Sequence, residues 1–251
     1  MNDYTDIFDR RGDLYNQAEQ IQPLARNTER QTLINLLELE PHHIVCDVPA
    51  GGGYLADGVR NYLEHPVQVI CVEPSRTFAQ GIDNAFTVYV AQMNELPIVD
   101  NSVNRVGSLA GLHHLADKAK FFSEAHRILK DGGIFAVADV LEGTPVAGFL
   151  NGPVDRYSIT GHRGLFLKKG EFVSLLEDAG FDRCEEQHVR YFWTFDSEEK
   201  MLRYCKSMFG LVNANLQQIK DAIDLYFTCE VTDKGVNLPW SLLYATGNVG
   251  K

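Results

Sequence analysis

Three features that would place the chain in a membrane or outside the cell are missing from its sequence. No apolar run approaches the roughly 20 residues that a membrane-spanning helix requires. The first residues are acidic and show neither the basic start nor the apolar core of a signal peptide. The five cysteines are scattered, without a Cys-x-x-Cys pair. We therefore expect a cytoplasmic protein with reduced cysteines, no metal and no membrane contact.

Clusters of basic residues are scarce as well. With 34 acidic and 23 basic side chains, the formal net charge is −11. Nucleic-acid binding depends on lysines and arginines that neutralise phosphates, so no nucleic-acid partner is expected. The 251 residues, of which 45% are hydrophobic, suffice for one α/β domain with insertions. We expect a small-molecule substrate and leave a homodimer open.

Residues 44–56 contain the strongest local pattern, Ile-Val-Cys-Asp-Val-Pro-Ala-Gly-Gly-Gly-Tyr-Leu-Ala. The β-branched run up to Val48 predicts a buried strand, which Pro49 and the glycines 51–53 end. From Tyr54, apolar residues recur at helical spacing. Glycines let a ligand approach the backbone closely, and a helix start offers free N–H groups. The segment therefore predicts a strand, a ligand-binding glycine loop and a helix.

Glu73 is the second indication of a ligand. It follows the next apolar strand, residues 67–72, and its carboxylate could accept two hydroxyl protons from a ribose diol. Asp47 lies before the glycines, where it would repel a pyrophosphate and attract an ammonium group. The pattern therefore favours a nucleoside that carries an amino group. A nicotinamide dinucleotide, and with it an oxidoreductase, stays a less favoured alternative.

The order Asp47-Val-Pro-Ala-Gly-Gly-Gly53 resembles motif I of the class I S-adenosylmethionine-dependent methyltransferases, with Pro49 in place of the first glycine. The turn at 97–106, the Leu-His-His-Leu at 112–115 and the later Glu-Ala-His-Arg are similar to the small-molecule branch called type 11. The likeness covers residues 44–140. It implies a doubly wound, Rossmann-like α/β fold. The sheet would have seven strands, mostly parallel, with an antiparallel last strand.

The resemblance also implies a single domain over residues 1–251. Residues 1–40 would form an N-terminal helical cover, and 41–140 the cofactor-binding core. Glycines and prolines make residues 141–168 an irregular loop, which we expect to contact substrate. Residues 197–238 are expected to be a helical insertion before the last strand, acting as a lid or a dimer contact.

For S-adenosylmethionine, the resemblance implies contacts at successive strand ends. Gln92 stands where the family places an acid that accepts the adenine amino group. Met93 either packs on the adenine or fills the core, and Tyr15 either closes over the methionine end or packs its own helix. The expected cofactor-binding set is Tyr15, Asp47, Pro49, Gly51, Gly53, Glu73, Gln92, Met93 and Ala110.

Methyl transfer from a sulfonium needs alignment and exclusion of water more than a catalytic triad, and the sequence shows no triad. No Asn-Pro-Pro-Tyr follows the fourth strand, which argues against nucleobase or amide acceptors. For an oxygen, sulfur or carbon nucleophile, His113 and His114 are the candidate catalytic residues, although His114 could instead pack at a helix start. The loop at 141–168 adds Tyr157, His162 and Arg163 as candidate acceptor-binding residues.

Two functions fit these observations. The favoured one is a methyltransferase that acts on a small molecule. The departures at Pro49 and Gln92 also fit a relative that binds S-adenosylmethionine without transferring its methyl group and serves as a partner or regulatory subunit. Formation of S-adenosylhomocysteine is expected only for the first.

Overall fold

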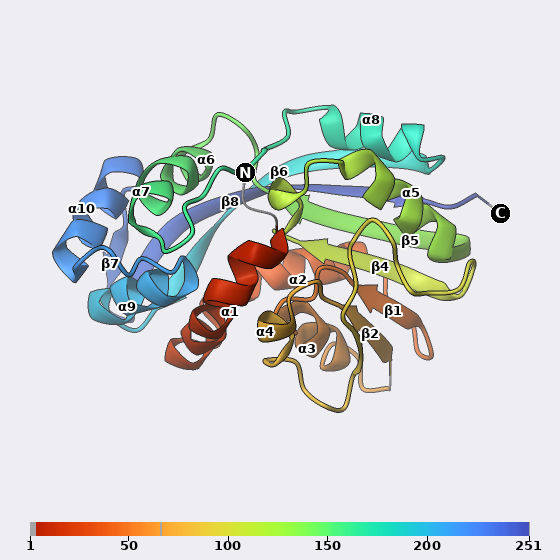
Figure 1. Ribbon diagram of the computed structural model, residues 1–251, viewed down its shortest axis with the longest axis horizontal. Coiled ribbons are helices and arrows are strands. Elements are labelled where there is room, and N and C mark those ends of the chain that lie inside the picture. The colour runs from red at the N-terminus through yellow and green to blue at the C-terminus, as the bar shows by residue number, and fades with distance from the viewer. Residues whose placement is uncertain (1–3, 66, 251) are drawn as a thin grey trace.

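The computed structural model describes residues 4–65 and 67–250. An open, twisted sheet runs through the molecule in the order β3-β2-β1-β4-β5-β8-β6 (Figure 1). Its first five strands are parallel: β1 (Ile44–Asp47), β2 (Gln68–Val72), β3 (Thr87–Tyr89), β4 (Val103–Leu109) and β5 (Leu129–Asp139). Because they are parallel, the segments that follow them all lie at one edge of the sheet.

The last part of the sheet is antiparallel. β8 (Gly235–Asn248) runs antiparallel to both β5 and β6 (Asp182–Phe195). The predicted fold class is confirmed, with one difference in the number of strands. β7 (Glu230–Thr232) adds an eighth strand, because the chain turns back after Thr232 and pairs this residue with Gly235.

Alternate side chains of the strands build two hydrophobic cores, one on each face of the sheet. Ala136 and Ala138 of β5 belong to the core covered by α2 (Asn27–Leu36) and α3 (Tyr54–Arg60). Phe135 and Val137 belong to the core covered by α5 (Lys118–Ile128) and α8 (Glu171–Asp178). This alternation is expected of a strand buried on both faces. No disulfide joins cysteines in the described part of the chain.

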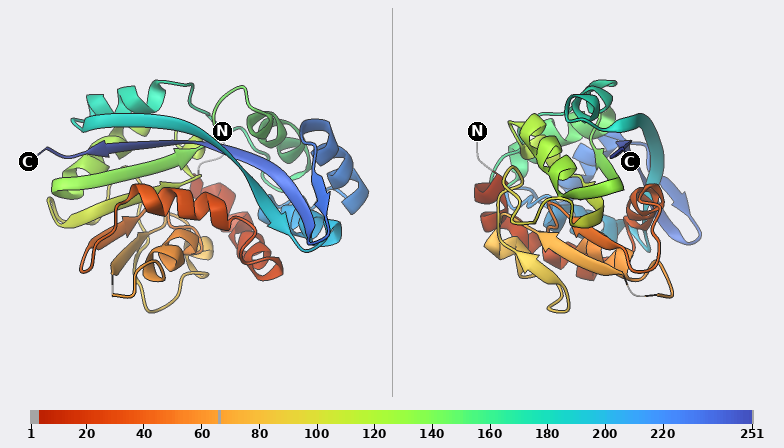
Figure 2. Two further views of the ribbon diagram at one scale, coloured as in Figure 1. Left: turned by 180° about the vertical axis from the view of Figure 1, so that it is seen from behind. Right: turned by 90° about the vertical axis from the view of Figure 1, so that its right-hand side faces the viewer.

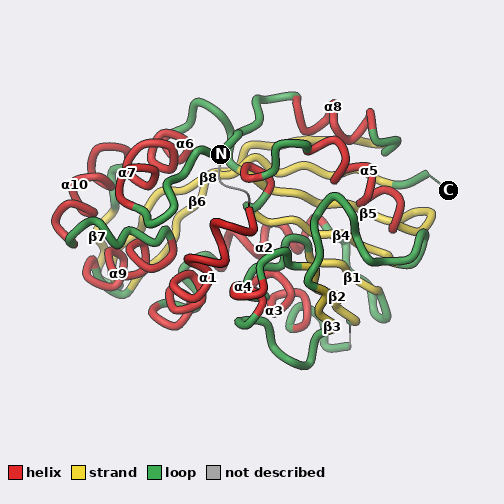
Figure 3. The backbone as a smooth tube through the Cα atoms, viewed as in Figure 1, coloured by secondary structure: helices red, strands yellow, loops and turns green. Residues whose placement is uncertain are grey.

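Residues 141–168 are more regular than their glycines and prolines suggested. They contain α6 (Pro145–Phe149), the π-helical turn η2 (Leu150–Val154) and α7 (Asp155–Tyr157). The Thr144 side chain caps α6 and Pro145 occupies its first turn, where a missing N–H costs nothing. The prediction of an irregular loop is therefore wrong up to Tyr157. Residues 158–170 do run mainly as a loop (Figure 3).

The insertion after β6 is helical, as predicted. It contains α9 (Glu198–Met208) and α10 (Leu216–Tyr226), and β8 begins within the predicted insertion, at Gly235. Seen from behind, β6 and β8 continue as a long curved ribbon from the sheet into this helical part (Figure 2). The helices pack on α1 (Tyr4–Ile21) and α6. Within the described ranges, no helix combines the length and apolar content needed to cross a membrane.

The N-terminal cover predicted over residues 1–40 consists of α1 and α2, and its first three residues lie outside the described part. α1 packs against α4 (Arg76–Ala79) on one side and α9 on the other. Its buried side chains include Tyr4, Ile7 and Phe8. α1 therefore lies between the core of the sheet and the helical insertion (Figure 1).

Candidate active site

The glycine loop follows β1, the strand that pairs with β2 on one side and β4 on the other. Gly51 and Gly53 have positive φ angles of 57° and 90°, which a residue with a side chain rarely adopts. The Gly51 N–H donates to Oε2 of Glu73 at 2.8 Å, and Pro49 follows a cis peptide bond. The predicted loop thus links the ends of β1 and β2.

Asp47 is buried at the end of β1. Its Oδ2 accepts the Ala56 N–H at 3.0 Å, but its Oδ1 has no hydrogen-bond partner among the described residues. Burial raises the pKa of this carboxyl group well above its usual value. Asp47 lines a small cavity, here called the glycine-loop cavity, together with Pro49, Gly51 and Ala110. A buried acid with one free oxygen fits an ammonium group.

Glu73 is fully buried at the end of β2 and accepts three hydrogen bonds. Its donors are the N–H groups of Gly51 and Ser75 and, at 3.0 Å, the hydroxyl of Tyr4 from α1. Burial raises the pKa of Glu73 to about 7, although these hydrogen bonds favour the charged form. Tyr4 therefore makes the kind of contact that a ribose hydroxyl would make.

Aromatic side chains of α1 and α4 fill much of the same edge. Phe8 stacks on Phe78 with ring centroids 4.8 Å apart, and Tyr15 meets Phe78 edge-on. The glycine-loop cavity keeps only about 40 Å³, which is far too small for a nucleoside. A nucleoside can enter only if these aromatic side chains, or the helices α1 and α4 that carry them, move.

Changing Tyr4 to Phe is expected to tighten binding of S-adenosylhomocysteine about fivefold. The variant has no Tyr4–Glu73 hydrogen bond to break, and such a bond contributes about 1 kcal/mol. Isothermal titration calorimetry measures the change. The control is Tyr62→Phe, which removes an exposed hydroxyl that donates to Asn35. Weaker binding by the Tyr4 variant would contradict the competition.

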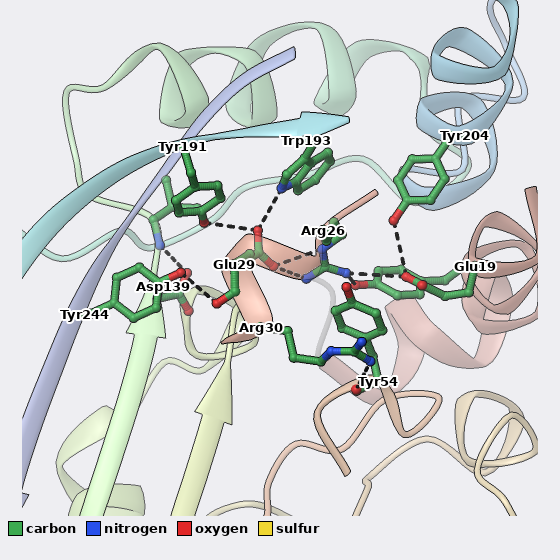
Figure 4. Close-up of polar contacts among 12 residues, drawn as sticks. Glu19, Arg26, Glu29, Arg30, Tyr54, Asp139, Tyr191, Trp193, Tyr204 and Tyr244 are labelled. Atoms are coloured by element: carbon green, nitrogen blue, oxygen red, sulfur yellow. Dashed lines mark hydrogen bonds and ion pairs between the residues drawn. The ribbon is translucent and has the colours of Figure 1, made fainter. Parts of the chain in front are cut away.

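Arg26 and Glu29 form the centre of a buried polar network beside this cavity (Figure 4). The Arg26 guanidinium donates to Oε1 of Glu29 and to the Tyr15 hydroxyl. Burial lowers the pKa of Arg26, but Glu29, Tyr15, Tyr204 and Glu19 together raise it by more, so the net shift is upward. Oε2 of Glu29 accepts the Tyr191 hydroxyl and the Trp193 indole N–H. The Arg26 and Glu29 side chains are 4% and 1% exposed, so the pair is buried.

A second cavity, the histidine cavity, adjoins the first. Phe8, Tyr15, Arg26 and Ala110 line both. The remaining lining residues come from α1, α2, the loop after β4, residues 140–162, β6, β8 and the insertion. They include His113, His114, His162, Met208, Trp193 and Trp240. The two tryptophans stack with ring centroids 4.0 Å apart. One end of this cavity is thus apolar and the other carries histidines.

His113 is fixed by Asp139, the last residue of β5. One Asp139 oxygen accepts the His113 backbone N–H at 2.9 Å, and the other lies 2.6 Å from His113 Nδ1. Burial alone would raise the pKa of Asp139, but His113 and two backbone N–H groups lower it below its usual value. The carboxylate is therefore charged and holds the proton on Nδ1. This leaves the Nε2 lone pair of His113 directed into the cavity.

The loop after α7 brings His162 to the same place. The His162 N–H donates to Asp155, and the Leu165 N–H donates to the backbone oxygen of His113 at 2.7 Å. His162 Nε2 lies 3.3 Å from His113 Nε2. Burial lowers the pKa of both His162 and His114 well below the usual value, and neighbouring positive charges add to this. The structure thus brings two predicted catalytic residues and one predicted substrate residue into one cluster.

The other predicted residues lie outside this histidine cluster. Arg163 is exposed and lines a third, outer cavity of about 270 Å³ with His114 and His162. Tyr157 is half-buried and stacks under Arg156. Gln92 is exposed and donates to Thr5 of α1 at 3.3 Å, while Met93 is 2% exposed within the core beneath α5. Neither Gln92 nor Met93 lines the glycine-loop cavity as it stands.

Several residues of the site were not predicted from the sequence, among them Tyr4, Arg11, Glu29, Asp139, Asn151 and Trp240. Asp139 had a usable signal, because it is an acid at the end of a parallel strand, as Asp47 and Glu73 are. Glu29 had no such signal in the sequence, because its partners Tyr191 and Trp193 are more than 160 residues away along the chain.

Comparison with known proteins agrees with this geometry. Residues 46–137 match the family model described as a methyltransferase domain, Methyltransf_11. The methyltransferase GfsG of Streptomyces halstedii is 25% identical over 181 residues, which are 66% of this chain and 63% of that protein. The dimethylglycine N-methyltransferase of Parasynechococcus marenigrum is 29% identical over 158 residues, or 59% of this chain and 56% of that protein. The chain thus spans less than two thirds of both relatives.

The YcgJ protein of Bacillus subtilis has a solved structure that is similar over most of its length. The two chains share 18% of their residues over 90% of this chain and 99% of the other, with a TM-score of 0.61. At this level of sequence identity, the likeness shows a shared fold and nothing about the activity.

Proposed function

Because this chain belongs to the type 11 family of class I S-adenosylmethionine-dependent methyltransferases, we propose that it transfers a methyl group from S-adenosylmethionine to a small-molecule acceptor. The acceptor atom would be an oxygen, sulfur or carbon nucleophile. The observation that carries this proposal is the pair of adjoining cavities, which share Phe8, Tyr15, Arg26 and Ala110. A donor in one and an acceptor in the other would lie side by side.

The residues of the glycine-loop cavity fit the cofactor. The free oxygen of Asp47 suits the amino group of its methionine part, and the Glu73 carboxylate suits two ribose hydroxyls. Gly51 and Gly53 have no side chains, so the cofactor can approach the backbone there. Tyr15 and Arg26 stand at the methionine end. We propose that Gln92 and Met93 approach the adenine only after α1 moves.

When bound, the cofactor supplies a methyl carbon that its sulfonium charge activates, and the carbon–sulfur electrons stay with sulfur as the acceptor lone pair forms the new bond. The chain has to hold the acceptor in line and exclude water. We assign activation of the acceptor to His113, which Asp139 orients, and to His114. His162, Arg163 and Tyr157 would contact the acceptor or its path of entry.

The histidine cavity also bears on the type of acceptor. The name of the relative from Parasynechococcus marenigrum indicates an amine acceptor, and a tertiary amine in its neutral form has no proton to lose. A hydroxyl or thiol does, and histidine lone pairs beside the cavity suit such an acceptor. The stacked tryptophans at the other end suit an apolar or flat body. We therefore favour a hydroxyl or thiol on an apolar small molecule, and no nucleic acid.

We further propose that residues 4–250 work as one domain. In it, residues 141–168 and 197–238 supply the acceptor walls, while the core at 41–140 holds the cofactor. Tritiated S-adenosylmethionine incubated with a metabolite extract is expected to give a labelled small product and an equal amount of S-adenosylhomocysteine. An Asp47→Asn variant, assayed at low cofactor concentration, serves as the control and is expected to give less of both products. Tight cofactor binding without turnover on any extract would instead support a non-catalytic binding protein.

A further inference from the structure

We propose that His113, His114 and His162 bind a divalent transition-metal ion, with Zn²⁺ as the model ion, at the floor of the histidine cavity. One ring nitrogen of each residue lies within 4.8 Å of the other two, and all three residues are buried. This inference rests on the proposed function, because it names how the acceptor would be activated. It also departs from the expectation of no metal, which considered cysteines only.

The tautomer of His113 follows from its neighbours. Asp139 is a carboxylate, which can only accept, so His113 Nδ1 must donate across the 2.6 Å contact. In the neutral ring, Nε2 then carries a lone pair and no hydrogen. A carboxylate behind the second nitrogen is the usual support for a metal-binding histidine, because it fixes the ring and makes the ligand more basic.

The tautomer of His162 is fixed in the same way by Asn151. The Gly164 N–H donates to Asn151 Oδ1 at 2.7 Å, and Asn151 Nδ2 donates to the Gly164 oxygen at 3.0 Å. These two bonds establish which end of the amide is the oxygen. His162 Nδ1 lies 2.9 Å from that oxygen and must donate to it. In the neutral ring, His162 Nε2 therefore also carries a lone pair and no hydrogen.

Two lone pairs thus face each other across 3.3 Å, the distance between the Nε2 atoms of His113 and His162. With both rings neutral, these two lone pairs cannot hydrogen-bond to each other, and they repel unless a cation lies between them, which is either a proton on His113 Nε2 or a metal ion. Zinc binds imidazole nitrogen at about 2.0–2.1 Å with tetrahedral angles, which sets two ligands about 3.3 Å apart. The observed separation is therefore that of two ligands of one tetrahedral ion.

His114 would be the third ligand. Its ring centroid lies 4.2 Å from that of His113 and 5.0 Å from that of His162. Three histidines leave one position of a tetrahedral ion open, as in catalytic rather than structural zinc sites. Because His114 and His162 also line the outer cavity, that position can be reached from solvent.

The positive charge of Arg11 opposes a metal ion at this site. The same residue also indicates which kind of group would take the open position on the ion. Its guanidinium lines the histidine cavity, is 4% exposed, and has no hydrogen-bond partner for Nε or Nη1 among the described residues. Arg11 Cζ lies 4.9 Å from the centroid of the Phe8 ring, but no carboxylate among the described residues pairs with it. A buried cation without a counter-ion is costly, so an anion is expected opposite it. An acceptor oxygen or sulfur bound to the ion would supply that anion after losing its proton to solvent through the outer cavity. The histidines would then act through the ion, without taking the proton themselves.

The test uses the full chain with S-adenosylhomocysteine bound, freed of metal by a chelator. Titration with Co²⁺ is expected to give the intense visible bands of a tetrahedral site at one equivalent, and Zn²⁺ should displace it. His162→Gln and His113→Gln should each weaken Zn²⁺ binding by at least about 100-fold. Asp139→Asn leaves every ligand in place and should weaken binding about 10- to 100-fold, which marks Asp139 as a positioning residue.

His65→Gln, at an exposed histidine outside the site, is the matched control and should bind Zn²⁺ as the unchanged chain does. Circular dichroism confirms that each variant is folded. Absence of tetrahedral Co²⁺ bands from the unchanged chain would overturn the proposal, as would Zn²⁺ binding that survives His162→Gln. If metal fails to bind while S-adenosylhomocysteine still binds, only this inference falls. Failure of both turnover and cofactor binding would refute the proposed function instead.

Discussion

Replacing Asp47 by Asn is expected to weaken binding of S-adenosylhomocysteine about 10- to 100-fold. The free Oδ1 of Asp47 is the buried acceptor available to the ligand's ammonium group, and a hydrogen bond to a charged group contributes about 1.5–3 kcal/mol. Asparagine keeps the shape and can still accept the Ala56 N–H, but it carries no charge.

The same substitution is expected to leave the fold intact. Burial raises the pKa of Asp47 because it disfavours the charged carboxylate, and the neutral amide of the same shape avoids this cost. Calorimetry gives the affinity, and thermal unfolding gives the stability. Asp57→Asn, at a half-exposed carboxylate on the adjoining helix α3, is the control and should bind normally. Equal affinities of the two variants would remove Asp47 from the site.

Replacing Glu29 by Ala is expected to lower the free energy of unfolding by about 3–5 kcal/mol. Its side chain accepts hydrogen bonds from Arg26, Tyr191 and Trp193 (Figure 4). Without it, Arg26 would keep only the Tyr15 hydroxyl and Glu19, 3.8 Å away, and the Trp193 N–H would stay buried without its acceptor. Removing one member of a buried ion pair costs this much because the remaining charge is uncompensated. α2 would also lose its polar link to β6.

Urea unfolding followed by circular dichroism measures this loss. Glu29→Gln keeps an oxygen acceptor and should cost less than the Ala variant. Glu199→Ala breaks an exposed pair with Arg203 on α9 and should change stability by less than about 1 kcal/mol. Similar losses for Glu29→Ala and Glu199→Ala would show that the network is no more than a surface contact.

The part of the site nearest the cofactor could be predicted because its signals are local. Asp47, Gly51 and Gly53 lie within one strand–loop–helix segment, and Glu73 follows the next strand. Parallel pairing of β1 and β2 is enough to place these residues together. The Leu-His-His-Leu segment follows the end of β4, and this position was enough to predict the edge of the sheet at which it lies.

The acceptor side could not be predicted, because its contacts join distant parts of the chain. His162 meets His113 only because Asn151 and Asp155 hold the loop after α7 in position. Glycines and prolines in this stretch suggested an irregular loop, yet Thr144 and Pro145 start a helix. A local pattern does not reveal which buried surface such a segment will cover.

The tryptophan pair has a practical consequence. The chain contains two tryptophans, Trp193 and Trp240, and both stand in the wall of the histidine cavity. Intrinsic fluorescence excited at the indole band therefore originates from one place in the molecule. Ligands that enter the cavity are expected to quench or shift this emission, so candidate acceptors can be screened optically, without labels and before any product is known.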